Sequence, residues 1–138
     1  MMKIGARQME ALDRAMDAAY AREMVRYLRA EHAEAVKGVA DAELLRRVQI
    51  AIDRAKAYGM TWDATITGFV AIMFEVAPTF DEQPAIRRVL HDERLPADVR
   101  IDALWDRTTD EDWDEAERLA EGAEAFWSGA RYLAQEQR

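Results

Sequence analysis

The sequence predicts an all-α protein, a single-domain bundle of about six helices over residues 1–138. Helix-favouring Ala, Leu, Met, Glu and Arg are abundant, and the chain has only three prolines and six glycines. Apolar residues recur at helical spacing in most segments. The densest apolar run, Phe69 to Phe74, lies in a stretch, Trp62 to Val76, whose charged residues are Asp63 and Glu75. Because a helix that is apolar on every side is a buried helix, Trp62 to Val76 is predicted to be central in the bundle.

Two amphipathic helices are predicted before that central helix. The first should run from about Ala6 to about Ala35, and Gly38 then breaks the pattern. Asp41 is expected to cap the second, Ala42 to Tyr58. Their inward stripes are Met9, Leu12, Met16, Ala19, Tyr20, Met24, Tyr27 and Leu28, and then Leu44, Leu45, Val48, Ile52 and Ala55.

The turn into the central helix is the best-defined local feature. Gly59 follows the last periodic residue and precedes apolar Met60, which is typical of a left-handed helix C-cap. A tight helical hairpin is therefore expected across these two residues. Thr61 is the expected N-cap of the central helix, because its hydroxyl can accept a hydrogen bond from a first-turn amide.

Three helices are predicted after Val76. Pro84 suits the first position of a short helix that ends near His91, and Leu95-Pro96 precedes a helix over about Ala97 to Arg107. The apolar side of the latter is Val99, Ile101, Leu104 and Trp105.

Thr109 is expected to cap the last predicted helix, because Thr109 with Asp112 three residues later resembles a capping box. The helix is expected to continue to the C-terminus as one helix, although Gly122 and Gly129 each cost it about 1 kcal/mol relative to Ala. Its apolar face is Trp113, Ala116, Leu119, Ala120, Ala123, Phe126, Trp127, Ala130 and Leu133.

Composition excludes several classes of protein. The chain has no cysteine, so disulfides, thiolate nucleophiles and cysteine-based zinc sites are excluded. The N-terminus lacks the apolar core of a signal peptide, and no apolar stretch reaches the about 20 residues that a membrane span needs, so a cytoplasmic location and no membrane partner are expected. A net charge of -8 argues against nucleic acid as a partner.

The negative charge is concentrated near the C-terminus. Residues 106–124 contain nine acidic residues and two arginines, a local net charge of -7. Asp110, Asp112, Asp114 and Glu121 match positions one, three, five and twelve of an EF-hand loop, but Glu115 replaces the glycine required at position six. We therefore expect no metal site there.

No motif indicates catalysis or a cofactor. His32 and His91 lack a second ligand at helical spacing, and Ser128 has no nucleophile-elbow glycines around it. Aromatic residues beside the acidic segment, namely Trp105, Trp113, Trp127 and Tyr132, are instead candidates for a surface that contacts a protein partner. The predicted partner-binding residues are Asp110, Asp112, Trp113, Asp114, Glu117, Glu121 and Trp127.

Several segments carry a family resemblance, namely 27–29, 55–61, 73–74, 78–81, 95–96 and 100–104. Together they resemble a group of small helical bacterial proteins encoded beside type VI secretion spike and effector genes, with a likeness over roughly residues 3 to 105. Gly5 and Ala77 are mild departures. The resemblance implies a helical fold and a genetic setting of loading chaperones, adaptors and immunity proteins, and it transfers no catalytic residue.

The first hypothesis is a non-enzymatic adaptor or chaperone for a type VI effector or spike component, with no cofactor. A second is an immunity protein that blocks a toxin with the acidic segment. A third is an enzymatic or metal-dependent domain built on the acids from Asp110 to Glu121. Because an acidic surface attracts basic partners, the first two predict a basic protein partner.

Overall fold

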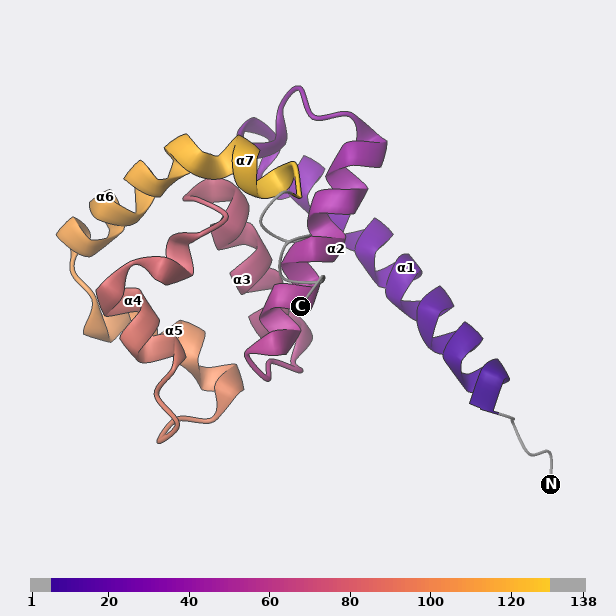
Figure 1. The fold of residues 1–138 in the computed structure, drawn as a ribbon, viewed down its shortest axis with the longest axis horizontal. Helices are drawn as coiled ribbons and strands as arrows, with labels where there is room; N and C mark the ends of the chain where they lie inside the picture. Colours follow the sequence, from indigo (N-terminus) through magenta and orange to yellow (C-terminus); the bar gives the residue numbers. More distant parts are fainter. Residues whose placement is uncertain (1–5, 130–138) are drawn as a thin grey trace. The chain divides into compact units, whose positions relative to one another are not determined.

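A computed structural model describes residues 6–129, apart from the side chains of residues 6, 7, 9, 10 and 12–14. Every regular element in that range is a helix, which confirms the predicted all-α class. The chain divides into two compact units, residues 1–49 and 50–138, and each is described separately below. That the two units make one domain stays a prediction. Figure 1 gives the element labels.

The first unit contains α1 (Ala6–Glu31), the 3-10 helix η1 (Ala33–Val36) and the start of α2 (Asp41–Ala57). α1 ends earlier than predicted because the chain tightens into η1. Arg29 then fixes the loop after η1, since its guanidinium donates to the Val36 carbonyl (3.0 Å) and to the Val39 carbonyl.

The prediction that Asp41 caps α2 is wrong. Asp41 is the first residue of that helix, and its carboxylate accepts a hydrogen bond from Arg29 at 2.8 Å. The Ala40 carbonyl accepts the bond from the Leu44 amide at 2.8 Å, so Ala40 stands at the helix entrance.

The predicted stripes of α1 and α2 are confirmed in part. Met24 and Leu28 are buried, whereas Met16 is 62% exposed and Tyr27 37%. Met9 and Leu12 lie outside the described side chains. In α2 the predicted inward residues are buried except for half-buried Leu45.

The second unit contains the end of α2 and the remaining elements. They are α3 (Asp63–Glu75), η2 (Phe80–Glu82), α4 (Pro84–Leu90), η3 (Ala97–Val99), α5 (Arg100–Arg107), α6 (Asp110–Arg118), η4 (Leu119–Gly122) and α7 (Ala123–Trp127). α4 packs beside α5, α3 also contacts α5, and α6 contacts η2 (Figure 1). Pro84 is the first residue of α4, as predicted, and the Gln83 side chain caps that helix by accepting from the Ile86 amide at 2.8 Å.

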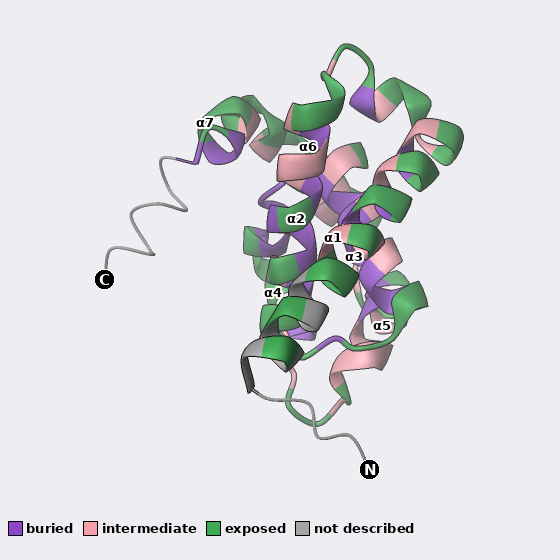
Figure 2. Cartoon of the chain, turned by 90° about the vertical axis from the view of Figure 1, so that its right-hand side faces the viewer, coloured by how far each residue is buried: buried purple, intermediate pink, exposed green. Residues whose placement is uncertain are grey.

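The predicted central helix is confirmed as α3, the most apolar helix of this unit. Six of its thirteen residues are buried, including Ile66, Phe69, Val70 and Met73. Figure 2 marks buried residues in purple. The Phe69 ring contacts Phe80 of η2, with centroids 5.2 Å apart. Phe69 also contacts Tyr58 at 5.5 Å, so aromatic packing links the end of α2 with α3 and η2.

The hairpin cap at Gly59 is confirmed. Gly59 has φ +91°, and its amide donates to the Lys56 carbonyl while the Met60 amide donates to the Ala55 carbonyl. These paired bonds are the Schellman arrangement, in which the left-handed residue satisfies the carbonyls of the last helical turn. The prediction that Thr61 caps α3 is wrong. Trp62 is the N-cap residue without a side-chain bond, and the Asp98 carboxylate binds this turn instead.

Two predictions about the C-terminal helices are also corrected. Residues 97–107 form η3 and then α5, and Trp105, predicted on the apolar side, is 59% exposed while Ile101 and Leu104 are buried. The last helix is not continuous, because the 3-10 helix η4 separates α6 from α7 and its last residue, Gly122, at φ -93° and ψ 7°, lies outside α-helical geometry. Ala130 and Leu133 lie outside the described residues.

Candidate functional site

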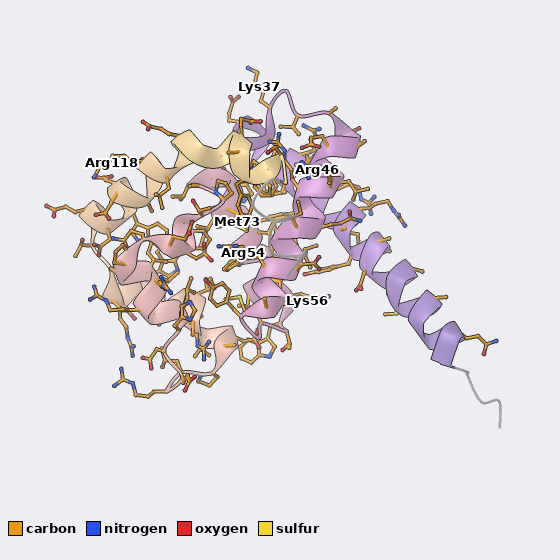
Figure 3. The ribbon with its side chains drawn as sticks, viewed as in Figure 1. Lys37, Arg46, Arg54, Lys56, Met73 and Arg118 are labelled. Carbon is orange, nitrogen blue, oxygen red and sulfur yellow. The ribbon has the colours of Figure 1, made fainter. Side chains whose placement is uncertain are left out.

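The predicted partner-binding residues of α6 lie mostly in solvent. Asp110, Asp114 and Glu117 are exposed, and so is Glu121 in η4. Arg118, labelled at the end of α6 in Figure 3, is the basic residue of that helix. We call the surface formed by Trp105, Asp110, Trp113, Asp114 and Glu117 the acidic face.

The capping box that begins α6 forms as predicted. The Asp112 carboxylate accepts from the Thr109 amide at 2.9 Å, and the Thr109 hydroxyl accepts from the Asp112 amide at 3.2 Å. The bond from the Thr109 amide is the main reason why the pKa of Asp112 is lowered. Gln83 also donates to Asp112 at 3.3 Å. Asp112 is therefore held by structural bonds, unlike the other acids of α6 named above.

Trp113 joins the acidic face to the core. Its indole nitrogen donates to the Thr108 hydroxyl at 2.8 Å, and its ring lies 6.3 Å from Phe80, nearly parallel to it. Trp105 of α5 is also stacked on Trp113, with ring centroids 5.2 Å apart and an interplanar angle of 22°. Trp105 is thus an exposed ring in a series of ring contacts that also includes Trp113, Phe80 and Phe69.

Trp105 lies beside the predicted partner-binding residues, but it was not included among them and was named only as an aromatic candidate. A tryptophan between exposed Asp102 and Asp106, just before a helix that carries Trp113, was the available signal.

Trp127 is not an exposed aromatic residue. It is 4% exposed, and its ring is stacked on Phe74 at 5.1 Å and contacts Phe126 edge-on at 5.0 Å. The cause is the break at η4, because α7 starts a new helix and buries both Phe126 and Trp127. Tyr132 lies outside the described residues.

A second site, which the sequence did not predict, is a polar cavity of about 440 Å³ in the second unit. We call it the Arg100 cavity. Its lining comes from the end of α2, η2, the end of α4 with the loop after it, and the start of α5, and comprises Arg54, Ala57, Tyr58, Asp81, Leu90, His91, Glu93 and Arg100.

An ion pair between half-buried Arg54 and buried Asp81 lines the Arg100 cavity. Arg54, labelled in Figure 3, donates through Nε and Nη2 to the two oxygens of Asp81, each at 2.9 Å. The Tyr58 hydroxyl donates to the same carboxylate at 2.6 Å, and Asp81 is 3% exposed. Burial is the main reason why the pKa of Tyr58 is raised, and the charge of Asp81 raises it further. A carboxylate this buried is tolerated because three donors satisfy it.

Arg100 also lines the cavity but has different partners. Its Nε donates to the Leu95 carbonyl at 3.0 Å and its Nη1 to the Leu90 carbonyl at 3.1 Å. Within residues 6–129 no carboxylate lies within ion-pair distance of this guanidinium. His91 lies beside Tyr58, with ring centroids 5.3 Å apart.

Between residues 6 and 129 no group of three or more His, Asp or Glu side chains is placed to hold a metal ion. No helix in the described range has both the length and the apolarity to cross a membrane. No protein-family model, no curated protein and no solved structure matches the chain.

Proposed function

We propose that the chain is a non-enzymatic accessory protein, an adaptor or chaperone, that holds a basic segment of a partner protein on the acidic face. The observation that carries the proposal is the exposed Trp105, stacked on Trp113 beside the exposed carboxylates of α6. The resemblance to proteins encoded beside type VI spike and effector genes makes such an effector or spike component the expected partner.

The ring stack supports a binding role on energetic grounds. Exposing the apolar surface of an indole ring to water is unfavourable, so covering that surface with a partner lowers the free energy. Stacking on a fixed neighbour orders the ring before any partner arrives. Because Trp113 is itself held by Thr108 and Phe80, Trp105 presents a firm surface with little conformational entropy left to lose.

The charge beside the stack indicates the chemistry of the partner. Two exposed acids, Asp102 and Asp106, flank Trp105 in α5, and a third, Asp110, is the first residue of α6. A Lys or Arg side chain can lie over an indole ring while pairing with a nearby carboxylate, which neutral or acidic segments cannot do. The negative field also speeds the encounter with a basic partner at low salt.

The experiment starts with capture of the partner by the tagged full-length chain in its native host, followed by mass spectrometry. A spike or effector component is the expected result, and a mature toxin domain would favour the immunity alternative. Binding kinetics with the purified partner are then measured for Asp110→Lys/Asp114→Lys/Glu117→Lys. Association should be at least about tenfold slower and should lose most of its salt dependence.

The matched control is Glu23→Lys/Glu31→Lys/Glu34→Lys, which reverses three exposed acids of the first unit and changes the net charge equally. It should keep the wild-type association rate at physiological salt. Equal losses in both triple variants would mean that only overall charge matters, and the acidic face would have to be abandoned as the binding site.

A further inference from the structure

We propose that the Arg100 cavity binds a small molecule or a chain end that carries one carboxylate, with Arg100 as its anchor. The proposal does not depend on the acidic face, because none of the residues of that face lines the cavity. Its volume of about 440 Å³ lies within the range of about 300–1,000 Å³ that is usual for small-molecule sites.

Arg100 is fixed before a ligand arrives. Bonds from Nε and Nη1 to the carbonyls of Leu95 and Leu90 hold the plane of the guanidinium, and both acceptors are neutral. The full positive charge therefore remains available on a group that presents further N–H donors. A guanidinium matches a carboxylate through two parallel hydrogen bonds, and a preordered one loses little entropy when it binds.

The remaining charges of the lining select the charge of the ligand. Arg54 and Asp81 neutralise each other through two bonds of 2.9 Å, and Tyr58 occupies the same carboxylate. Glu93 adds a negative charge to the lining. The two arginines and the two carboxylates of the lining sum to zero formal charge, so a monoanion on Arg100 leaves a net charge of -1, whereas a phosphate dianion would leave -2 near Asp81 and Glu93.

Apolar lining indicates room for the rest of the ligand. Leu90 and Ala57 both line the cavity and present aliphatic atoms, and His91 adds a polar ring beside Tyr58. A carboxylate attached to a short aliphatic or amino-acid side chain has this combination of charge and apolar surface. Free carboxylic acids and the C-terminal residue of a peptide share it.

The test uses the full-length chain and three sets of probes. These are the free L-amino acids, straight-chain monocarboxylic acids of about two to six carbons, and short peptides with a free C-terminus. Each probe is paired with its amide, and inorganic phosphate is a further probe. Binding is followed by NMR of the arginine Nε–H signals and by thermal shift.

We expect at least one free acid to bind and its amide to bind at least about tenfold more weakly, because a charge-assisted bond is lost. Binding of the amino acids or monocarboxylic acids but not of the peptides identifies a small-molecule site. Binding of the peptides alone identifies a site for chain ends. Either result supports the carboxylate site. Equal binding of acids and amides, preference for phosphate, or no binding by any probe would overturn it.

Two substitutions locate the bound probe. Ala57→Leu adds bulk to the cavity lining at an exposed position and should weaken binding at least about tenfold without lowering stability. Ala64→Leu, at an exposed position of α3 outside the lining, is the control and should bind as wild type. Arg100→Gln should abolish binding, but it also disturbs the bonds to Leu90 and Leu95, so Ala57→Leu decides. Undiminished binding by Ala57→Leu would overturn the assignment of the cavity.

Discussion

The N-termini of α3 and α6 are both closed by a carboxylate, but the carboxylates come from different distances along the chain. In α6 the cap is local, because Thr109 and Asp112 satisfy each other's amides within one turn. In α3 the cap comes from Asp98, more than thirty residues later. Its Oδ1 accepts from the amides of Thr61 and Trp62 at 2.8 and 2.9 Å, and its Oδ2 accepts from the Thr61 hydroxyl.

The difference shows that a bond from a backbone amide to a carboxylate can stabilise only a helix start, or can in addition hold two distant segments together. The box at Thr109 stabilises a helix start and orders only its own turn. The Asp98 carboxylate also ties η3 to the start of α3, and Thr65 adds a bond to the Asp98 carbonyl at 3.0 Å. Gly59 lies at the same junction, because a Cβ atom placed there would lie 3.3 Å from Ala97.

The largest expected effect in this junction is that of Gly59→Val. A β-branched residue must adopt the left-handed backbone at φ +91° and push against Ala97, which should cost at least about 2 kcal/mol in the free energy of unfolding. Urea unfolding measures it. Gly122→Val is the matched control, because φ is -93° and nothing lies within 4 Å of an added Cβ atom. Equal costs for the two valines would refute the strained turn.

A smaller effect is expected from removing each cap. Thr109→Ala should cost about 1 kcal/mol, the usual value for a helix N-cap. Asp98→Ala should lower the Tm further, because it leaves three donors without their acceptor and releases η3 from α3. Both variants are compared by thermal unfolding at neutral pH. A greater loss of Tm in Thr109→Ala would mean that the distant cap contributes no more than a local one.

The same contrast explains which parts of the fold could be predicted. Gly59, Pro84 and the box of Thr109 with Asp112 were predictable because each depends on residues within a few positions. The cap by Asp98 was not, since it needs the folded approach of η3 to α3. The apolar period continued through η4, so sequence spacing alone could not locate that break.

The features of the two candidate sites also divide into those that could be predicted from nearby residues and those that depend on the folded packing. The concentration of acids on α6 is visible in the sequence, but the stacking of Trp105 on Trp113 and the burial of Trp127 depend on where α5 and α7 pack. The Arg100 cavity was missed entirely. Its polar residues come from four separate segments, and none of those segments has a motif that predicts the others.

The smallest expected effect is a loss, at acid pH, of the stability that the Asp98 and Asp112 carboxylates contribute. Burial acts to raise the pKa of Asp98, but bonds from the Trp62 and Thr61 amides and from the Thr61 hydroxyl outweigh it, so the pKa is lowered. The pKa of Asp112 is lowered chiefly by the Thr109 amide. For both groups the folded state binds its proton more weakly than the unfolded chain does. Their stabilisation is therefore present above the unfolded pKa of about 4 and is lost as pH falls below it.

Asp98→Asn and Asp112→Asn test this directly, because each removes the titrating charge and keeps one oxygen acceptor. The difference in unfolding free energy between wild type and each variant should be largest near neutral pH. It should shrink as pH falls from about 5 toward 2, since the wild-type carboxylate is protonated more readily in the unfolded chain than in the folded protein in that range. Urea midpoints at several pH values measure it. The change should be larger for Asp98, whose oxygens accept two backbone amides against one for Asp112. A difference that stays constant down to about pH 2 would show that the charge of the cap is irrelevant and that only its shape matters.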